Sequence, residues 1–462
     1  MRKPSLSLLT LAIPLAASAT SQVLAQAASP YAALDAYLDS VAAHDRAMGT
    51  LHILRGDSTV YSRAIGMASL EPPVPAAPDR RYRVGSVSKT FTAAVVLRLV
   101  EEGRLGLDDR IGGHFPDVPN ADSITVRQLL GHRSGINSVT DDANYMQQST
   151  RPVSRTEMLS WMATRPAVFS PGERFGYSNS NYILLTYLIE DVTGGSYDEA
   201  LRRYVTGPFY SRDAPHSLKH VRGVRADDRQ VNELLSYRWG GGEAGWLPMP
   251  VTDASIPLGA GAVSATAEDV ARFYRGLLSG RLLGPERLAE MLTLGEGEQR
   301  MGLGIFGMDY DGHAGYGHTG SIDGFRAVAS YFPADSLTLV YLENATRRGE
   351  HDVALAALQS SFGDEVTFPD FADVALAEVE HEASYLESLA GTYANADFPL
   401  DIAIRVEDGR LVGQATGQGP FPLTSLAGGV FAYEPAGITM RFPEPGTMAF
   451  AQGALSMTFR RE

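Results

Sequence analysis

Apolar residues recur at helical spacing in the first two thirds of the chain. The strongest stretch is nearly continuous from Val87 to Val100 and is closed by Gly103, which predicts a helix buried on almost every side. Further helical patterns lie at Leu34, Leu38 and Val41 after Ser29-Pro30, at 182–192 and at 267–279.

A period of two predicts strands at both ends of the same segment. Residues 49–54 and 59–67 predict a hairpin over the turn RGDS, and FRAVASYF and LTLVYLENA flank 333–336 in the same way. A helix at 352–362 is expected to pack back on this sheet. Strands at both ends with helices between them predict one α+β domain, whose antiparallel sheet is closed by distant parts of the chain.

The pattern changes again after residue 363. Residues 364–386 are acidic and predict a linker with a short helix. From 387 to 462 apolar and polar residues alternate, as in 400–406, and turn sequences such as EDG separate the runs. We therefore expect a small antiparallel β-barrel or sandwich of roughly 75 residues.

The first residues are expected to be a secretory signal. Arg2 and Lys3 precede an apolar run from Leu6 to Ala17, and small residues follow up to Ala27. A membrane anchor is less favoured, because the run is shorter than the about 20 residues that span a bilayer. We predict that residues 1–27 are removed and that the mature protein is periplasmic or secreted, with no membrane anchor.

Composition excludes several kinds of chemistry. The chain has no cysteine, which excludes disulfides, thiol catalysis and thiolate metal sites. Removing Arg2 and Lys3 from the 39 basic residues leaves 37 against 54 acidic ones, a formal charge of −17, so nucleic acid is a poor partner. His216 and His220 stand four apart without the carboxylate of an HExxH zinc site, and we expect them to be solvated. No metal or cofactor is predicted.

Lysine is rare enough for its positions to be informative. The 39 basic residues include three lysines, Lys3, Lys89 and Lys219, and 36 arginines. Lys89 lies in the buried helix three residues after Ser86, so the two side chains share one helix face. Burial lowers the pKa of an ammonium, and neutral Lys89 is then able to accept the hydroxyl proton of Ser86 and make it a nucleophile. The alternative is an N-capping serine and a lysine that reaches back to water.

Four stretches in fixed order resemble one superfamily of enzymes: SVSKTFT, ITVRQLLGHRSGI, FSPGERFGYSNSNYILL and GHTGSIDGF. They resemble the serine beta-lactamases and penicillin-binding proteins, specifically the class C beta-lactamase and DD-peptidase-like branch grouped as peptidase family S12. The resemblance covers about residues 30–362. It implies a beta-lactamase/transpeptidase-like catalytic domain at 28–363, an antiparallel sheet flanked by helices with a helical subdomain. For 387–462 it implies a lipocalin-like β-barrel, as in D-aminopeptidase relatives.

The resemblance gives a role to a second motif. Tyr177 and Asn179 match a loop that lies beside the nucleophile in the family. The tyrosine there transfers protons to the leaving group or activates the deacylating water, and the asparagine amide holds Lys89 and a substrate carbonyl. Tyr393–Asn395 has the same pattern but lies in the β-only tail, where we expect a turn.

The third motif is His318-Thr319-Gly320, where many relatives have Lys-Thr-Gly. The resemblance implies that its strand lines the cleft and that Thr319 bonds the substrate. The amide of Ser321, with that of Ser86, is implied to form an oxyanion hole.

Neighbouring residues leave alternatives open. His313 begins a His-Ala-Gly of the same spacing, and we prefer His318 because only it leads directly into SIDGFRAVASYF. Trp239 and Trp246 either border the substrate or serve ordinary packing.

The resemblance implies a serine hydrolase in which Ser86 attacks, an acyl-enzyme forms and water resolves it. A peptidase or amidase on D-amino-acid-containing peptides, D-aminopeptidase or DD-peptidase-like, leads because histidine is usual there in the third motif. An esterase is second. A class C-type beta-lactamase is third, since His318 replaces the cation that attracts the drug's carboxylate. A DD-carboxypeptidase also needs a cation to bind the terminal carboxylate of its substrate, and only Arg300 or Arg326 could supply it. A penicillin-binding sensor or an inactive scaffold is the non-enzyme alternative.

Overall fold

The computed structural model describes the following residues: 29–142, 144–209, 218–223, 233–240, 245–295, 300–347, 352–368, 379–395, 401–416, 420–433, 438–452 and 455–462. The predicted signal segment, 1–27, lies outside these residues, as does His216. Within them, no helix is both long and apolar enough to cross a membrane.

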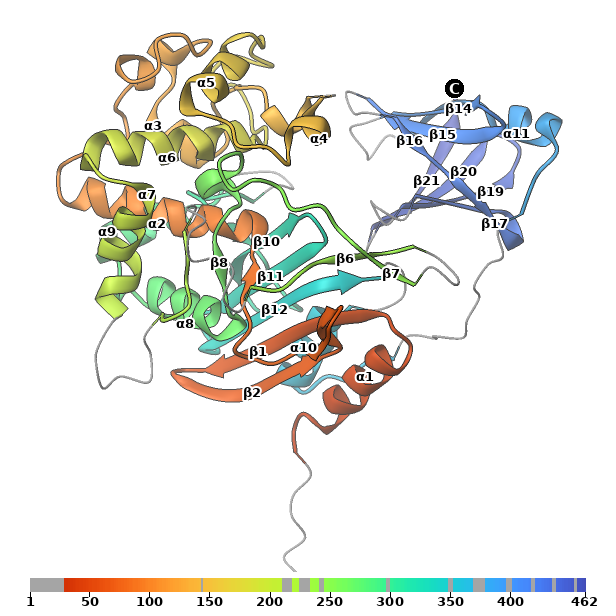
Figure 1. Cartoon of the computed structure of the whole chain (residues 1–462), viewed down its shortest axis with the longest axis horizontal. Helices are drawn as coiled ribbons and strands as arrows, with labels where there is room; N and C mark the ends of the chain where they lie inside the picture. The colour runs from red at the N-terminus through yellow and green to blue at the C-terminus, as the bar shows by residue number, and fades with distance from the viewer. Residues whose placement is uncertain are drawn as a thin grey trace, which may run out of the picture.

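Helices and strands follow one another along the chain as in Figure 1. The helices are α1 Ala32–Ala43, α2 Ser88–Glu101, α3 Val126–Leu130, α4 Tyr145–Gln148, α5 Arg155–Ala163, α6 Asn179–Thr193, α7 Tyr197–Leu201, α8 Ala267–Leu278, α9 Pro285–Leu292, α10 Val353–Phe362 and α11 Ala383–Leu389. The strands are β1 Ala47–Arg55, β2 Ser58–Ile65, β3 Met67–Leu70, β4 Pro73–Pro75, β5 Tyr82–Arg83, β6 Tyr237–Trp239, β7 Trp246–Pro248, β8 Ser264–Ala265, β9 Phe306–Gly307, β10 Tyr316–Ile322, β11 Phe325–Phe332, β12 Leu337–Thr346, β13 Gly391–Ala394, β14 Ile402–Glu407, β15 Arg410–Ala415, β16 Phe421–Pro422, β17 Thr424–Leu426, β18 Val430–Tyr433, β19 Ile438–Glu444, β20 Thr447–Gln452 and β21 Leu455–Arg461.

The main sheet joins the two ends of the first domain. Its strand order is β2-β1-β12-β11-β10-β9, and β6 adds to β12 in parallel. β1 lies between β2 and β12, so Leu51 pairs with Arg63 on one side and with Tyr341 on the other. Both predicted hairpins are confirmed, and so is the closure of the sheet by distant segments.

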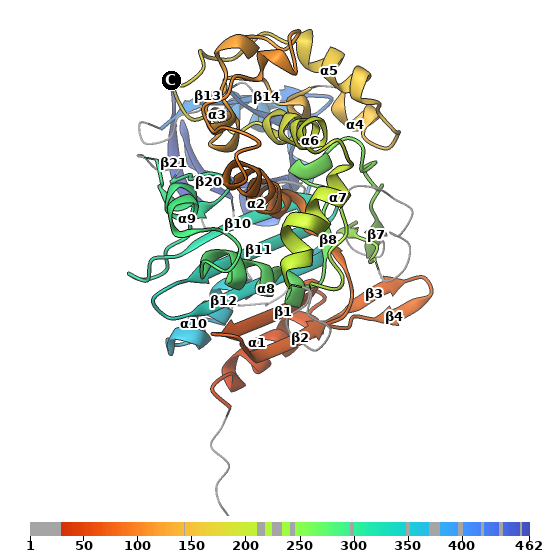
Figure 2. The same cartoon turned by 90° about the vertical axis from the view of Figure 1, so that its left-hand side faces the viewer.

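Helices cover both faces of this sheet (Figure 1, Figure 2). Side chains on successive strand residues point to opposite faces. In β12, Val340 and Leu342 therefore join the core around α2 and α8, while Leu339 and Tyr341 join the core beneath α1 and α10. The expected α+β arrangement, an antiparallel sheet flanked by helices, is the one observed.

The apolar run after Val87 forms the centre of the larger core. α2 is buried from Ser88 to Leu97, because the sheet lies on one side and the helical subdomain of α3 to α6 on the other (Figure 1). A 3-10 turn, η1 (Gly85–Val87), precedes it and holds Ser86. The helix therefore begins one residue later than predicted.

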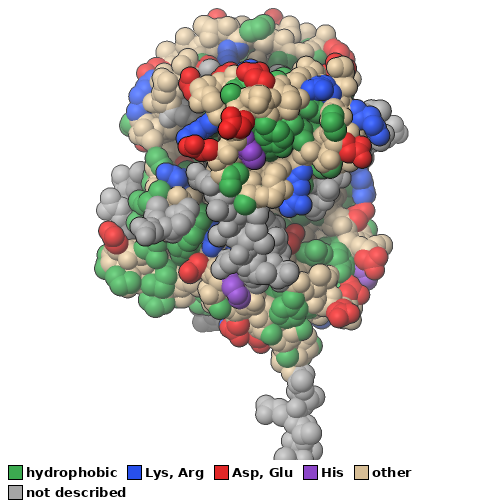
Figure 3. All heavy atoms as spheres, turned by 90° about the vertical axis from the view of Figure 1, so that its right-hand side faces the viewer, with side chains coloured by type: hydrophobic (Ala, Val, Ile, Leu, Met, Phe, Trp, Pro, Cys, Tyr) green, Lys and Arg blue, Asp and Glu red, His purple; other side chains and the backbone are tan. Residues whose placement is uncertain are grey.

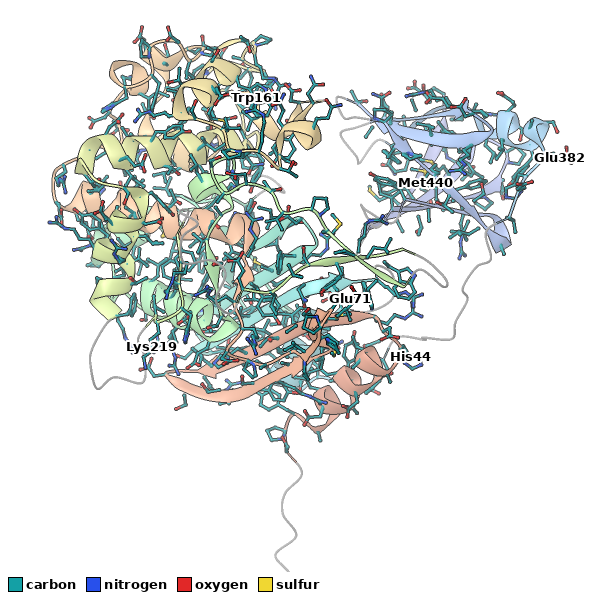
Figure 4. The ribbon with its side chains drawn as sticks, viewed as in Figure 1. His44, Glu71, Trp161, Lys219, Glu382 and Met440 are labelled. Carbon is teal, nitrogen blue, oxygen red and sulfur yellow. The ribbon has the colours of Figure 1, made fainter. Side chains whose placement is uncertain are left out.

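The C-terminal part is a nearly closed antiparallel barrel of nine strands, in the order β16-β15-β14-β13-β21-β20-β19-β18-β17. Its core holds Met440, labelled in Figure 4, together with Tyr393. Tyr393–Asn395, expected to be a turn, is mostly strand β13, and Tyr393 is fully buried with its hydroxyl donated to Leu389 O. Likeness to a lipocalin and the domain boundaries stay predictions. On the face in Figure 3 the described acidic and basic side chains are interspersed.

Candidate active site

Lys89 is fully buried beside Ser86. Its Nζ lies 3.0 Å from Ser86 Oγ, 2.8 Å from Asn179 Oδ1 and 2.7 Å from Ala260 O. Lys89 has no exposed surface, whereas Lys219 is exposed near the edge of the molecule (Figure 4). The spacing of Ser86 and Lys89 therefore brings two reactive groups into direct contact in a buried place.

The three partners of Lys89 fit a neutral amine. Ala260 O and Asn179 Oδ1 only accept hydrogen bonds, and they use the two N–H groups of a neutral lysine. A charged Nζ donates to Ser86 Oγ. In the neutral amine this third position carries a lone pair instead, which is able to accept the hydroxyl proton of Ser86. Burial holds the pKa of Lys89 well below its usual 10.5, which favours this neutral form.

Tyr177 contacts the same serine oxygen from the other side. Its hydroxyl donates to Ser86 Oγ over 2.8 Å, and its ring centre lies 4.9 Å from Lys89 Nζ. Burial raises the pKa of Tyr177 well above its usual 10.0, so the phenol keeps its proton at neutral pH. Tyr177 is therefore a proton donor at rest, and Ser86 bridges a donor and an acceptor.

His132 positions Tyr177, a role that no predicted motif assigns to it. Its Nδ1 accepts from the Ser178 amide over 3.1 Å, and its ring stacks on Tyr177 with 4.3 Å between centroids. Burial, and secondly the proximity of Lys89, hold the pKa of His132 well below 6.5, so its ring is neutral. The available signal was its place in LLGHRSGI, one of the four family-like stretches.

Two glycines let strand β10 approach the nucleophile closely. Gly85 has φ +52°, and a methyl group there would lie 2.6 Å from the Ser321 amide nitrogen. A methyl at Gly320 would lie 3.0 Å from the Ser86 amide nitrogen. The two amides expected to form an oxyanion hole thus belong to segments in backbone contact.

A buried ion pair links these two segments, and nothing in the sequence pattern indicated it. Arg83, three residues before Ser86, pairs with Asp323, two residues after Ser321. Their side chains are 1% and 4% exposed, and Asp323 Oδ1 also accepts from the amide and hydroxyl of Thr252.

A cavity of about 490 Å³ opens at this place. Among its lining residues are Ser86, Tyr177, His318, Thr319, Gly320 and Ser321. Lys89 and Asn179 are the two expected site residues outside this lining. Lys89 contacts Ser86 directly, and Asn179 reaches the site through Lys89. The structure therefore brings all the expected site residues together around Ser86.

Residues 33–363 match the protein family described as Beta-lactamase. The chain belongs to the beta-lactamase family. It is 24% identical over 296 residues to the "Putative penicillin-binding protein PbpX" of Bacillus subtilis, which is 64% of this chain and 70% of that protein. A D-stereospecific amidohydrolase from Streptomyces sp. is 28% identical, with a TM-score of 0.58 over 68% of this chain and 94% of its own. An octameric penicillin-binding protein homologue from Pyrococcus abyssi is 21% identical, with a TM-score of 0.62 over 92% and 99%. These relatives agree with the assignment of the chain to the S12 branch that the sequence motifs predict.

The rival histidine of this beta-lactamase-family chain lies elsewhere. His313 Nδ1 pairs with Asp335 over 2.9 Å, and its ring lies 4.0 Å from that of Phe362. His318 is 2% exposed and lies in the cavity beside Ser86. The structure thus brings His318, not His313, to the nucleophile.

Of the other candidate residues, only Arg326 lines the cavity at Ser86. Trp239 and Trp246 pack edge to face on the paired strands β6 and β7. His220, expected to be solvated, is half-buried and faces Asp269. Arg300 pairs with Asp309 on the surface, while Arg326 lines the cavity. The described residues contain no group of three metal ligands.

Proposed function

We propose that this member of the beta-lactamase family is an exported serine hydrolase that forms an acyl-enzyme on Ser86 with Lys89 as the base. Its proposed substrates are peptides or amides that contain D-amino acids. The observation that carries the proposal is the contact of Ser86 Oγ with both buried Lys89 Nζ and the Tyr177 hydroxyl. Export rests on the predicted signal at 1–27.

The proposed reaction begins as Ser86 Oγ attacks the substrate carbonyl carbon and gives its proton to Lys89 Nζ. The amides of Ser86 and Ser321 stabilise the oxyanion. When the C–N bond breaks, the leaving nitrogen takes the Tyr177 proton, and the proton held by Lys89 replaces it. Water then attacks the acyl carbon and gives a proton to Lys89, which returns it to Ser86 Oγ as the acid leaves.

Two observations support the choice of substrate. The Streptomyces protein at 28% identity is a D-stereospecific amidohydrolase. In addition, the third motif carries a buried neutral histidine where a cation would attract a carboxylate, because burial lowers the pKa of His318 to about 3.

Labelling and turnover test the proposal together. A fluorescent fluorophosphonate should label Ser86 in the parent and nothing in Ser86→Ala. D-Phenylalanine amide should be hydrolysed faster than its L-enantiomer, a short acyl ester or nitrocefin. Lys89→Arg should lose this activity and Lys219→Arg should keep it, because only Lys89 contacts the nucleophile.

Each other outcome assigns a different function. Faster nitrocefin hydrolysis indicates a beta-lactamase, and ester cleavage alone indicates an esterase. Labelling of Ser86 without turnover indicates a penicillin-binding sensor. No label at all on folded protein rejects the enzyme.

A further inference from the structure

The side-chain amide of Asn179 has a different partner at each end. Its Oδ1 accepts from Lys89 Nζ over 2.8 Å, and its Nδ2 donates to Thr140 Oγ1 over 3.0 Å. The family resemblance gives a role to Asn179 and none to Thr140, which is half-buried and lies outside the lining of the cavity at Ser86. Any effect of Thr140 on the base therefore passes through the Asn179 amide.

A ring of hydrogen bonds holds Thr140 against the start of α6. The backbone N–H of Asn179 donates to Ser138 Oγ over 3.1 Å, and Ser138 Oγ lies 2.8 Å from Thr140 Oγ1. The backbone N–H of Val139 donates to Ser180 Oγ over 3.0 Å, which adds a second contact between the same two segments. The position of the Thr140 hydroxyl relative to the Asn179 side chain is thus fixed.

The Thr140 hydroxyl also has a partner that only accepts. Burial raises the pKa of Asp141, while Arg165 and a hydrogen bond from the Thr140 side chain oppose this rise. Because a carboxylate has no proton to donate, the Thr140 O–H points to Asp141 and its oxygen lone pairs are left for Asn179 Nδ2. The reverse orientation of the amide would bring Asn179 Oδ1 to an oxygen whose proton is already used, and two acceptors would face each other.

We infer that Thr140 is a positioning residue, which fixes the orientation of the Asn179 amide and so keeps the lone pair of Lys89 free for the Ser86 proton. With Oδ1 toward Lys89, the amide accepts one N–H of the amine. In the reverse orientation Nδ2 would donate to the lone pair of neutral Lys89 and compete with the Ser86 hydroxyl. The inference rests on the proposed function for the role of Lys89 as the base.

The pH profile of acylation reports on Lys89, because the titratable groups around it keep one charge state. The rings of Tyr177 and Tyr182 lie 4.9 and 5.7 Å from Lys89 Nζ, and burial raises the pKa of both phenols well above 10.0. Burial holds the pKa of His132 well below 6.5 and lowers that of His318 to about 3. In the neutral and alkaline range, a shift of the midpoint is therefore a change at Lys89.

The rate at which an uncharged fluorophosphonate labels Ser86, measured against pH on the full chain, tests the inference. Thr140→Val keeps the shape of the side chain and removes the hydroxyl. It should lower the plateau rate about 3- to 10-fold, the range for one uncharged hydrogen bond. It should also move the midpoint to lower pH, since the ammonium form of Lys89 loses a fixed acceptor. Thr140→Ser, which keeps the hydroxyl, should match the parent in both respects.

Thr193→Val is the matched control. Thr193 is the last residue of α6, and its hydroxyl donates to Ile189 O over 2.7 Å, so the variant also loses one hydrogen bond but should change neither the plateau nor the midpoint. In the unsubstituted chain, neutron diffraction after deuterium exchange should show the deuterons of Asn179 Nδ2 toward Thr140. This readout does not depend on the folding of a variant.

The outcomes separate the two proposals. Deuterons of Asn179 Nδ2 toward Lys89, an unshifted midpoint in Thr140→Val, or a Thr140→Ser profile like that of Thr140→Val overturns the inference. If the parent is labelled but hydrolyses no D-amide, the role of Thr140 stands and the proposed substrate fails. If Ser86 of the folded parent is not labelled, the proposed function fails, and the orientation seen by neutron diffraction alone decides the inference.

Discussion

Replacing Asp323 by asparagine should destabilise the catalytic domain strongly, although it removes no atom from the core. The change removes the carboxylate with which buried Arg83 forms its ion pair. Asparagine tolerates the φ of +53° at this position and keeps an oxygen that accepts from the Thr252 amide. The loss of the negative charge is therefore the main change that the substitution makes.

The magnitude follows from burial. Breaking a buried ion pair by removing one partner costs about 3–5 kcal/mol, and the retained Thr252 contact places this variant near the lower end. With a urea dependence of about 3 kcal/mol per molar, a loss of about 3 kcal/mol lowers the unfolding midpoint by about 1 M. Asp108→Asn is the control, because Asp108 is 82% exposed in its pair with Arg127 and such pairs contribute under about 1 kcal/mol.

Urea unfolding followed by tryptophan fluorescence is the suitable assay. All three tryptophans, Trp161, Trp239 and Trp246, precede residue 363, so the signal reports on this domain and not on the barrel. The double variant Arg83→Met with Asp323→Asn should recover most of the stability, since it also removes the buried guanidinium whose ion pair was broken. Equal midpoints for Asp323→Asn and Asp108→Asn, or no recovery in the double variant, would refute the reasoning.

Three further predictions concern the reaction. Lys89→Arg should lower kcat about 10²–10⁴-fold, as expected for loss of a general base, and a variant above a tenth of parental activity contradicts this role. Only neutral Lys89 accepts a proton, so kcat/KM of the parent for an uncharged ester should rise with pH, with a midpoint below 10.5. A flat pH profile would contradict the role of Lys89 as the base. Tyr177→Phe should slow amide hydrolysis far more than hydrolysis of a p-nitrophenyl ester, whose leaving group needs no proton; equal losses mean that Tyr177 acts otherwise.

The local patterns predicted the main elements of the fold because each repeats over enough residues to show its period. The buried run of α2 and the hairpin β11 to β12 are of this kind. Strands β5 and β8 have two residues each, too few for any period. The prediction of a turn at Tyr393 was wrong. It followed from the likeness of Tyr393–Asn395 to the second motif, whereas the residues around it alternate as in a strand, and this alternation buries Tyr393 with Ile402.

The same contrast holds for the site. Ser86 and Lys89 are three residues apart on one helical face, so spacing alone paired them. His132 accepts a hydrogen bond from the amide of Ser178, which is 46 residues later in the sequence. Arg83 pairs with Asp323, which is 240 residues later. The periodicity of the sequence does not predict contacts between such distant residues, because these contacts depend on the register of β10 and on the path of the loop before α6.

The polypeptide enters and leaves the catalytic domain at one corner. α1 packs beside α10 under the sheet, and Ser360 Oγ donates to Pro30 O over 3.2 Å. The first and last elements of the domain thus lie close together in space, and domains with this arrangement tolerate circular permutation. A short linker from residue 363 to residue 29 would join the natural ends, and new ends placed in an exposed loop far from Ser86 would leave every strand of the sheet intact.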